Sequence, residues 1–96
     1  MISSQIRTVQ ALVDQKADEL SIRNALGPPS FVATPGFRDP RGHELAAMWP
    51  MPADEASTIR QKAQHWPRTL VYDGALIKFV FLDERGRAVE CAFANN

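Results

Sequence analysis

The last third of the chain, from Leu70 to Phe93, combines alternating apolar segments with two glycine-containing turns. Asp73-Gly74 between apolar runs is a strong signal for a two-residue hairpin turn, in which both turn residues have positive φ. The segment 83–86 ends in glycine and fits a longer hairpin turn, with Gly86 in the left-handed conformation. The sequence therefore predicts a three-stranded antiparallel meander over residues 69–93.

Successive side chains of a strand point to opposite faces of its sheet. In the predicted central strand, Ile77, Phe79 and Phe81 share one face, and Leu76, Lys78 and Val80 share the other. In the predicted last strand, Val89, Cys91 and Phe93 alternate with Ala88, Glu90 and Ala92. Placing the charged Lys78 and Glu90 on one face directs the Phe-rich face toward the helices.

Residues 3–26 show the periodicity of helices. Apolar residues recur at spacings of three and four, at Ile6, Val9, Val13, Ala17 and Leu20. Asp18 is a candidate start for a second helix, with Ile22, Ala25 and Leu26 facing inward. Gly27-Pro28-Pro29 ends the helical segment, because glycine adopts the left-handed conformation and proline cannot continue a helix. The pattern leaves open whether this segment is one bent helix or two.

The middle of the chain predicts a hairpin over residues 31–49. Two apolar segments flank Asp39-Pro40-Arg41-Gly42, whose residue types suit a type I turn. Residues 54–65 form either a weak helix or an ordered loop, because the apolar stripe of Ala56, Ile59 and Ala63 is thin.

The chain has 96 residues, of which 45% are hydrophobic and 23% charged. A chain of this length forms one domain and buries enough surface for an ordinary core without disulfides. We therefore predict a single domain over residues 1–96. Its predicted fold class is α+β, a two-layer sandwich in which an N-terminal helix or helix pair packs on a mainly antiparallel sheet.

Charge and cysteine content favour some partners and compartments over others. Eleven basic residues balance eleven acidic ones, for a net charge of +0, whereas nucleic-acid binders usually have a basic excess. No apolar segment approaches the ~20 residues of a membrane span, and the N-terminal residues lack the apolar run of a secretory signal. Because Cys91 is the sole cysteine, no intrachain disulfide forms. We expect a cytoplasmic protein with no nucleic-acid or membrane partner.

Residue types that carry out catalysis are present, but they form no recognisable motif. His43 precedes a glutamate, and adjacent side chains in a strand point to opposite faces. The spacing of His43, His65 and Cys91 matches no metal-binding motif. Asp83 and Glu84 occupy a predicted turn, which needs polar residues. We therefore predict no catalytic, cofactor-binding or metal-binding residues. An enzyme that pairs a histidine with a carboxylate is the third-ranked hypothesis.

Four residues are candidates for binding. Arg38 and Arg41 lie at the tip of the predicted hairpin, and arginine near an aromatic residue is a frequent anchor at interfaces. The alternative for this pair is a solvated turn. Trp49 and Trp66 lie near methionines and prolines, and form either an apolar surface patch or part of the core.

Short motifs give the chain a resemblance to a known family. They are a helix ending in Leu26-Gly27-Pro28-Pro29, a strand running from Trp66 to Tyr72, and a hairpin with Phe79 and Phe81 that turns at Gly86. This order resembles SmpA/OmlA-type domains, small α-α-β-β-β modules of outer-membrane assembly lipoproteins, whose fold β-lactamase-inhibitor proteins share. The resemblance covers about half of the chain and implies a non-catalytic domain that binds protein partners. Membrane assembly is not carried over, because the N-terminal region has no lipidated cysteine.

These observations lead to two leading hypotheses of function. The first is a non-catalytic protein-interaction module that acts as an assembly, adaptor or inhibitor-like domain. The alternative is a small-ligand-binding domain with an aromatic-lined pocket between the sheet and the Pro-rich segment. A homo-oligomer is compatible with the first hypothesis, because exposed sheet edges favour strand pairing between copies.

Overall fold

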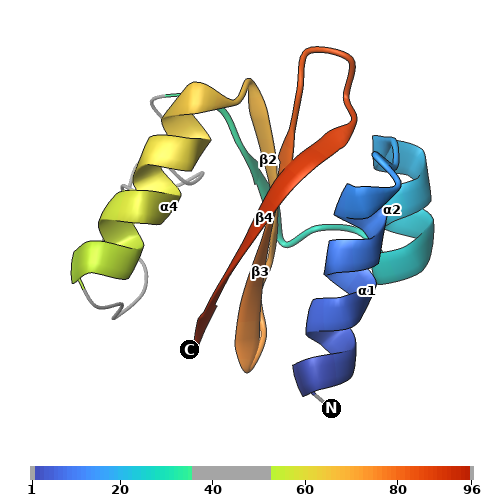
Figure 1. Cartoon of the computed structure of the whole chain (residues 1–96), viewed down its shortest axis with the longest axis horizontal. Helices are drawn as coiled ribbons and strands as arrows, with labels where there is room; N and C mark the ends of the chain where they lie inside the picture. Colours follow the sequence, from blue (N-terminus) through green and yellow to red (C-terminus); the bar gives the residue numbers. More distant parts are fainter. Residues whose placement is uncertain (1, 36–52, 96) are drawn as a thin grey trace.

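The computed structural model describes residues 2–35 and 53–95. Within these ranges the elements are α1 (Ile2–Asp14), α2 (Glu19–Leu26), β1 (Phe31–Ala33), α4 (Ala53–His65), β2 (Arg68–Tyr72), β3 (Leu76–Leu82) and β4 (Ala88–Asn95). The strands form one antiparallel sheet in the order β1-β2-β3-β4. Figure 1 shows this sheet edge-on, with helices on both sides.

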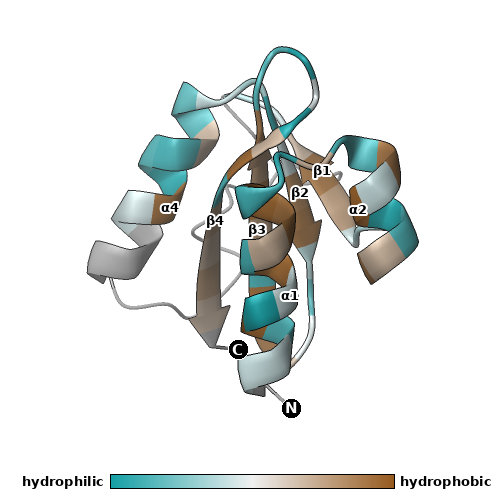
Figure 2. Ribbon diagram, turned by 45° about the vertical axis from the view of Figure 1, so that its right-hand side comes forward, coloured by the Kyte–Doolittle hydropathy of each residue, from teal (hydrophilic) through white to brown (hydrophobic). Residues whose placement is uncertain are grey.

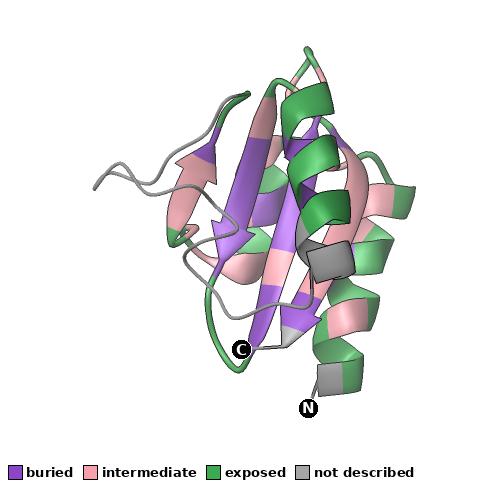
Figure 3. Ribbon diagram, turned by 90° about the vertical axis from the view of Figure 1, so that its left-hand side faces the viewer, coloured by how far each residue is buried: buried purple, intermediate pink, exposed green. Residues whose placement is uncertain are grey.

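The α+β class is confirmed, with α1 and α2 packed on an antiparallel sheet. These two helices form a core cluster with one face of the sheet, here called the α1/α2 face, and its buried residues are Val9 and Ile22 of the helices and Leu70, Tyr72, Val80, Leu82 and Ala88 of the strands. On the opposite face, here called the α4 face, the buried cluster consists of Ile59 and Ala63 of α4 and of Val71, Ile77, Phe79, Phe81 and Ala94 of the strands. A further layer, α4, therefore covers the second side of the sheet (Figure 2). In Figure 3 the strands are coloured mainly as buried or intermediate, whereas the helix in front of them is mainly exposed.

The helical segment consists of two helices, and the junction between them explains why. Lys16 has positive φ (50°), and its N–H donates to the carbonyl of Val13, while the N–H of Ala17 donates to that of Leu12. This pair of hydrogen bonds is the Schellman pattern that ends a helix, here with lysine where glycine is usual. Asp18 then caps α2, because its side chain accepts a hydrogen bond from the N–H of Ser21.

The restart at Asp18 changes which residues face the sheet. Val9 is fully buried and Val13 packs beside it, as the stripe predicts. The prediction that Leu20 continues this stripe is wrong, since its side chain is 69% exposed. Ala25 is also exposed, whereas Ile22 is fully buried. The apolar residues of α2 face a direction that is independent of the direction faced by those of α1. The spacing of apolar residues therefore does not continue across the junction.

The first predicted hairpin is described only in part. Its first segment is β1, which pairs with β2 in the register Phe31↔Val71. Residues 36–49 of that prediction lie outside the described residues. Residues 53–65 form a helix rather than a loop, and Ile59 and Ala63 are the buried positions of its described stripe.

The predicted two-residue turn at Asp73-Gly74 is wrong. Three residues, 73–75, separate β2 from β3, and Lys16 is the one non-glycine residue with positive φ in the described part of the chain. Instead, the N–H of Asp73 donates a hydrogen bond to the hydroxyl of Ser30, and the carboxylate of Asp73 accepts one from the N–H of Gly74. The turn is therefore tied to the segment before β1. In the β3–β4 turn, Gly86 does supply the left-handed residue (φ 76°).

The predicted orientation of the Phe-rich face is wrong. Phe79 and Phe81 lie on the α4 face, and the N-terminal helices contact Val80 and Leu82 instead. The alternation predicted for β4 also fails, because Phe81 pairs with Glu90 while Leu82 pairs with Ala88. This β-bulge adds one residue to β4 and moves Val89 to the α4 face, while Cys91 and Phe93 stay on the α1/α2 face.

Candidate functional site

Of the four predicted binding residues, the described part of the chain contains Trp66. Arg38, Arg41 and Trp49 lie outside the described residues. Trp66 follows α4 directly, is half-buried, and packs against the cluster on the α4 face. Its indole Nε1–H donates to a carboxylate oxygen of Glu90 on β4. Trp66 therefore links the end of α4 to β4, and part of its side chain remains exposed at the surface.

Two more side chains complete this contact between α4 and β4. The ammonium of Lys62 lies 3.6 Å from the other carboxylate oxygen of Glu90. The ring of His65 meets that of Trp66 edge-on, with centroids 4.6 Å apart and planes at 83°. Such an edge-to-face pair is a favourable aromatic geometry. The hydrogen bond from its Nε1–H to Glu90 holds the indole of Trp66 in one orientation.

A surface depression of about 330 Å³ lies beside Trp66. The end of α4 and the β3–β4 turn line it, through His65, Trp66, Pro67, Asp83, Glu84 and Arg85. Its volume is at the lower end of the range of small-molecule sites, roughly 300–1,000 Å³. Its lining combines aromatic residues at the end of α4 with charged residues of the turn, and the depression opens to solvent.

The carboxylate of Asp83 belongs to the turn itself. Its Oδ1 accepts hydrogen bonds from the N–H groups of Arg85 (2.9 Å) and Arg87 (3.0 Å). The hydrogen bond from Arg87 is the main cause that lowers the pKa of Asp83. This carboxylate is therefore ionised and committed to turn structure, as the sequence predicts for residues 83–84.

The side chain of Cys91 has the environment of a structural thiol. It is half-buried on the α1/α2 face, and this burial raises the pKa of the thiol. A protonated thiol is a weak nucleophile and a weak metal ligand. Within residues 2–35 and 53–95, no group of three or more His, Cys, Asp or Glu side chains is arranged to hold a metal ion.

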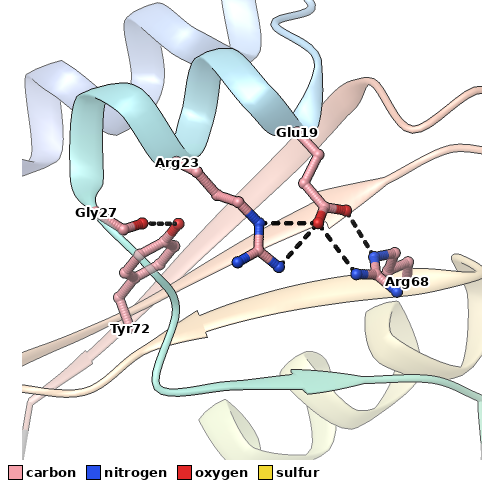
Figure 4. A network of polar contacts seen from close by, with 5 residues as sticks. All are labelled: Glu19, Arg23, Gly27, Arg68 and Tyr72. Atoms are coloured by element: carbon pink, nitrogen blue, oxygen red, sulfur yellow. Dashed lines mark hydrogen bonds and ion pairs between the residues drawn. The ribbon is translucent and has the colours of Figure 1, made fainter.

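A network of polar contacts centres on Glu19 of α2 (Figure 4). Arg68 of β2 donates to both oxygens of its carboxylate, at 2.6 and 3.0 Å, and Arg23 donates to one of them at 2.9 Å. The hydrogen bonds from Arg68 are the main cause that lowers the pKa of Glu19. Nearby, the hydroxyl of Tyr72 donates to the carbonyl of Gly27. These contacts hold α2 against β2 at both ends of the helix.

The strand β4 lies at one edge of the described sheet. On one side β4 pairs with β3 along its length. On the other side, the N–H of Ala88 donates to the carbonyl of Ala17 at 2.8 Å, and Asp18 forms an isolated bridge with Arg87. The α1–α2 junction thus covers the beginning of β4. Beyond it, β4 crosses the front of Figure 1 with α4 on one side and α1 on the other.

Comparisons with known proteins found no matching family model, no matching curated protein and no matching solved structure. Each helix in the described ranges is too short or too polar to cross a membrane.

Proposed function

We propose that this domain is a non-catalytic protein-interaction module that binds an extended partner segment along the edge of β4. The position of β4 at the edge of the sheet, within the described residues, is the observation that carries this proposal. Unpaired backbone N–H and C=O groups of an edge strand bind a further strand, and neighbouring side chains give the partner its specificity. The domain would act in the cytoplasm as an assembly, adaptor or inhibitor-like module.

The surroundings of β4 support this proposal. Glu90 is the charged residue of the strand, and Trp66 and Lys62 hold its carboxylate toward α4. The thiol of Cys91 has the raised pKa of a buried group rather than that of a nucleophile. The resemblance to SmpA/OmlA-type domains agrees with partner binding. In this proposal Arg38, Arg41, Trp49 and Trp66 contribute further contacts.

The test is capture of proteins from a lysate of the native host by the immobilised domain, followed by mass spectrometry. Three forms are compared: the wild type, Ala92→Lys on β4, and a variant with alanine at Arg38, Arg41, Trp49 and Trp66. We expect specific partners on the wild type that are depleted on Ala92→Lys. Partners retained by both variants would contradict the proposed surfaces. Absence of any specific partner would contradict the module itself.

The depression beside Trp66 supports a second candidate function, binding of a small ligand. Its lining includes Trp66, whose indole is oriented by Glu90, and the exposed charged residues Glu84 and Arg85. It ranks second because it is open to solvent, whereas typical ligand sites are enclosed.

A thermal-shift screen tests this second function. Compounds that raise the unfolding temperature of the wild type, and do so less for Glu84→Ala, would support a site in the depression. Glu84 is exposed in a turn, so its replacement leaves the core intact. Asn24→Ala on the exposed surface of α2 is the matched control and is expected to respond as the wild type does.

A further inference from the structure

The depression beside Trp66 brings together two separate parts of the chain. The end of α4 contributes His65, Trp66 and Pro67, and the β3–β4 turn contributes Asp83, Glu84 and Arg85. Figure 1 shows these two parts at the same end of the molecule. The first part contains an indole and an imidazole, whereas the second part is charged. A ligand in the depression therefore contacts both aromatic and charged residues.

The charge of the lining favours a positively charged ligand. Asp83 and Glu84 are acidic and Arg85 is basic, so the lining has a net charge of −1 (two negative charges and one positive) when His65 is neutral. Hydrogen bonds from the N–H groups of Arg87 and Arg85 lower the pKa of Asp83, so its carboxylate is ionised at neutral pH. Glu84 is exposed in the turn.

Two cations near the depression have partners elsewhere. The guanidinium of Arg87 donates a hydrogen bond to the carbonyl of Lys16 at the α1–α2 junction. The ammonium of Lys62 lies 3.6 Å from the carboxylate of Glu90 on β4. Neither side chain belongs to the lining of the depression, so the negative charge of the lining is not balanced by them at the site itself.

The aromatic part of the lining favours the same charge. The hydrogen bond from its Nε1–H to Glu90 orients the indole of Trp66, and the ring of His65 packs against it edge-to-face. Trp66 is half-buried, so part of its side chain is accessible. The face of an indole attracts a cation that lies within about 6 Å of the ring centroid. A side chain that is already oriented also loses less freedom on binding.

We propose that the depression beside Trp66 binds a guanidinium group of the kind that arginine carries. This inference rests on the second candidate function, binding of a small ligand, and names the chemical class of the ligand. A guanidinium is planar, stacks on aromatic rings and donates parallel hydrogen bonds to a carboxylate. It is also more weakly hydrated than an ammonium, so aromatic contact replaces its water at a smaller cost. In this proposal Trp66 stacks on the guanidinium, and Glu84 accepts its hydrogen bonds.

The first experiment compares two probes of the same shape, N-acetylarginine amide and the uncharged N-acetylcitrulline amide. The chain has two tryptophans, so Trp49→Phe leaves Trp66 as the sole indole for a fluorescence titration. We expect a saturable change with the arginine probe, with a dissociation constant in the millimolar range, and no change with the citrulline probe. Heteronuclear NMR of the wild type is the second readout, in which the arginine probe shifts the indole N–H signal of Trp66.

Three substitutions locate the site. Glu84→Gln removes a carboxylate from the lining and should raise the dissociation constant about two- to fivefold, as expected for an exposed ion pair. Asp14→Asn on the exposed surface of α1 makes the same change in net charge away from the depression, so it is the matched control with no expected effect. Arg85→Gln removes a positive charge from the lining and should leave binding equal or tighter. Circular dichroism checks that each variant is folded.

A further titration separates the two sources of a guanidinium. Methylguanidinium represents a free small molecule, and a tripeptide with arginine between two glycines, blocked at both ends, represents the side chain of a partner segment. Tighter binding of the tripeptide supports a partner segment as the source. Equal affinity supports a small molecule.

Equal binding of the arginine and citrulline probes overturns the inference, as does an equal effect of Glu84→Gln and Asp14→Asn. Weaker binding to Arg85→Gln also overturns it, because that result means that an anionic group occupies the site. Each failure is distinguishable from failure of the second candidate function. An uncharged or anionic compound that binds in the thermal-shift screen, and binds less to Glu84→Ala, keeps the ligand site and removes the guanidinium as its ligand.

Discussion

The two faces of the sheet differ in the side chains at the centre of their packing. On the α1/α2 face, apolar packing is supplemented by directional polar contacts, the Glu19–Arg68 ion pair and the Tyr72–Gly27 hydrogen bond. The α4 face also has polar contacts, from Trp66 and Lys62 to Glu90, but large aromatic side chains form its centre. Phe79 and Phe81 are fully buried there, and Phe31 and Trp66 pack beside them.

The need for polar contacts on the α1/α2 face concerns α2, because α1 has thirteen residues, as many as α4. The helix α2 has eight residues, and Ile22 is its buried position. So short a stripe buries little area, and polar contacts at its two ends fix its place. The helix α4 has thirteen residues and contacts a face with two phenylalanines in its centre. Burial of apolar area is the larger contribution to stability, so changes at the centre of the α4 face should have the largest effects.

The strongest test is Phe79→Ala in β3. Phe79 is 0% exposed at the centre of the α4 face, so its truncation removes buried area and leaves a cavity. We expect the free energy of unfolding to fall by about 3–5 kcal/mol, measured by urea denaturation. Leu70→Ala makes the corresponding change on the α1/α2 face and should cost about 2–5 kcal/mol.

Leu20→Ala is the control for both truncations. Its side chain is 69% exposed on α2, so we expect a change within about 0.5 kcal/mol. A loss at Leu20 as large as that at Phe79 would contradict the assignment of the two faces.

The second test removes the ion pair from the α1/α2 face by Glu19→Gln. The carboxylate is 26% exposed and accepts from two arginines, of which Arg68 is 42% exposed. Because solvent screens these groups in part, we expect a loss of about 1–2 kcal/mol at neutral pH, between the values for exposed and buried pairs. The matched control is Glu84→Gln in the exposed β3–β4 turn, with little expected change.

The effect of Glu19→Gln should depend on pH. The pKa of Glu19 is lowered from its ordinary value of 4.5, mainly by the hydrogen bonds from Arg68. Its stabilising contribution is therefore fully present above 4.5 and is lost as the pH falls through the lowered folded-state pKa. Urea denaturation over a pH series should show the wild type and the variant converging in acid. A difference that is constant with pH would exclude the ion pair as its cause.

These contrasts also explain which parts of the fold could be predicted from sequence. Some features depend only on residues that are close in the sequence, so they could be predicted from it. They are the buried positions of Val9 and Ile22, the end of α2 at Gly27 and the turn at Gly86. The orientation of β3 failed because the prediction assumed one buried face. Its near-continuous apolar run, with Lys78 as the interruption, is itself typical of a strand covered on both sides.

The site features depend on contacts between distant residues. Glu19 and Arg68 are 49 positions apart, and Trp66 and Glu90 are 24 apart. No spacing rule connects such pairs. Sheet edges were expected in general terms, and the assignment of one edge to β4 required the strand order. Trp66 was predicted either to form a surface patch or to belong to the core, and in the structure it packs against the core and lines the depression.

The third test concerns a buried polar group on the α4 face. Thr69 is 0% exposed, and its hydroxyl has no hydrogen-bond partner in the described part of the chain. Thr69→Val keeps the shape and removes this buried, unsatisfied hydroxyl, so we expect a gain of about 1 kcal/mol in urea denaturation. Thr69→Ser keeps the hydroxyl and loses a methyl group, so it should be destabilising. A loss of stability in the valine variant would mean that the hydroxyl is satisfied.

The smallest expected effect is at the junction that separates α1 from α2. Lys16 has positive φ (50°), where a Cβ atom is sterically unfavourable, and its side chain is exposed. Lys16→Gly removes that strain but increases the conformational freedom of the unfolded chain. We expect a net gain of about 0.5 kcal/mol in thermal or urea unfolding. Lys16→Ala removes the same charge and keeps the Cβ atom, so it should show no such gain. Equal gains in both variants would attribute the effect to charge and mean that the turn between α1 and α2 is unstrained.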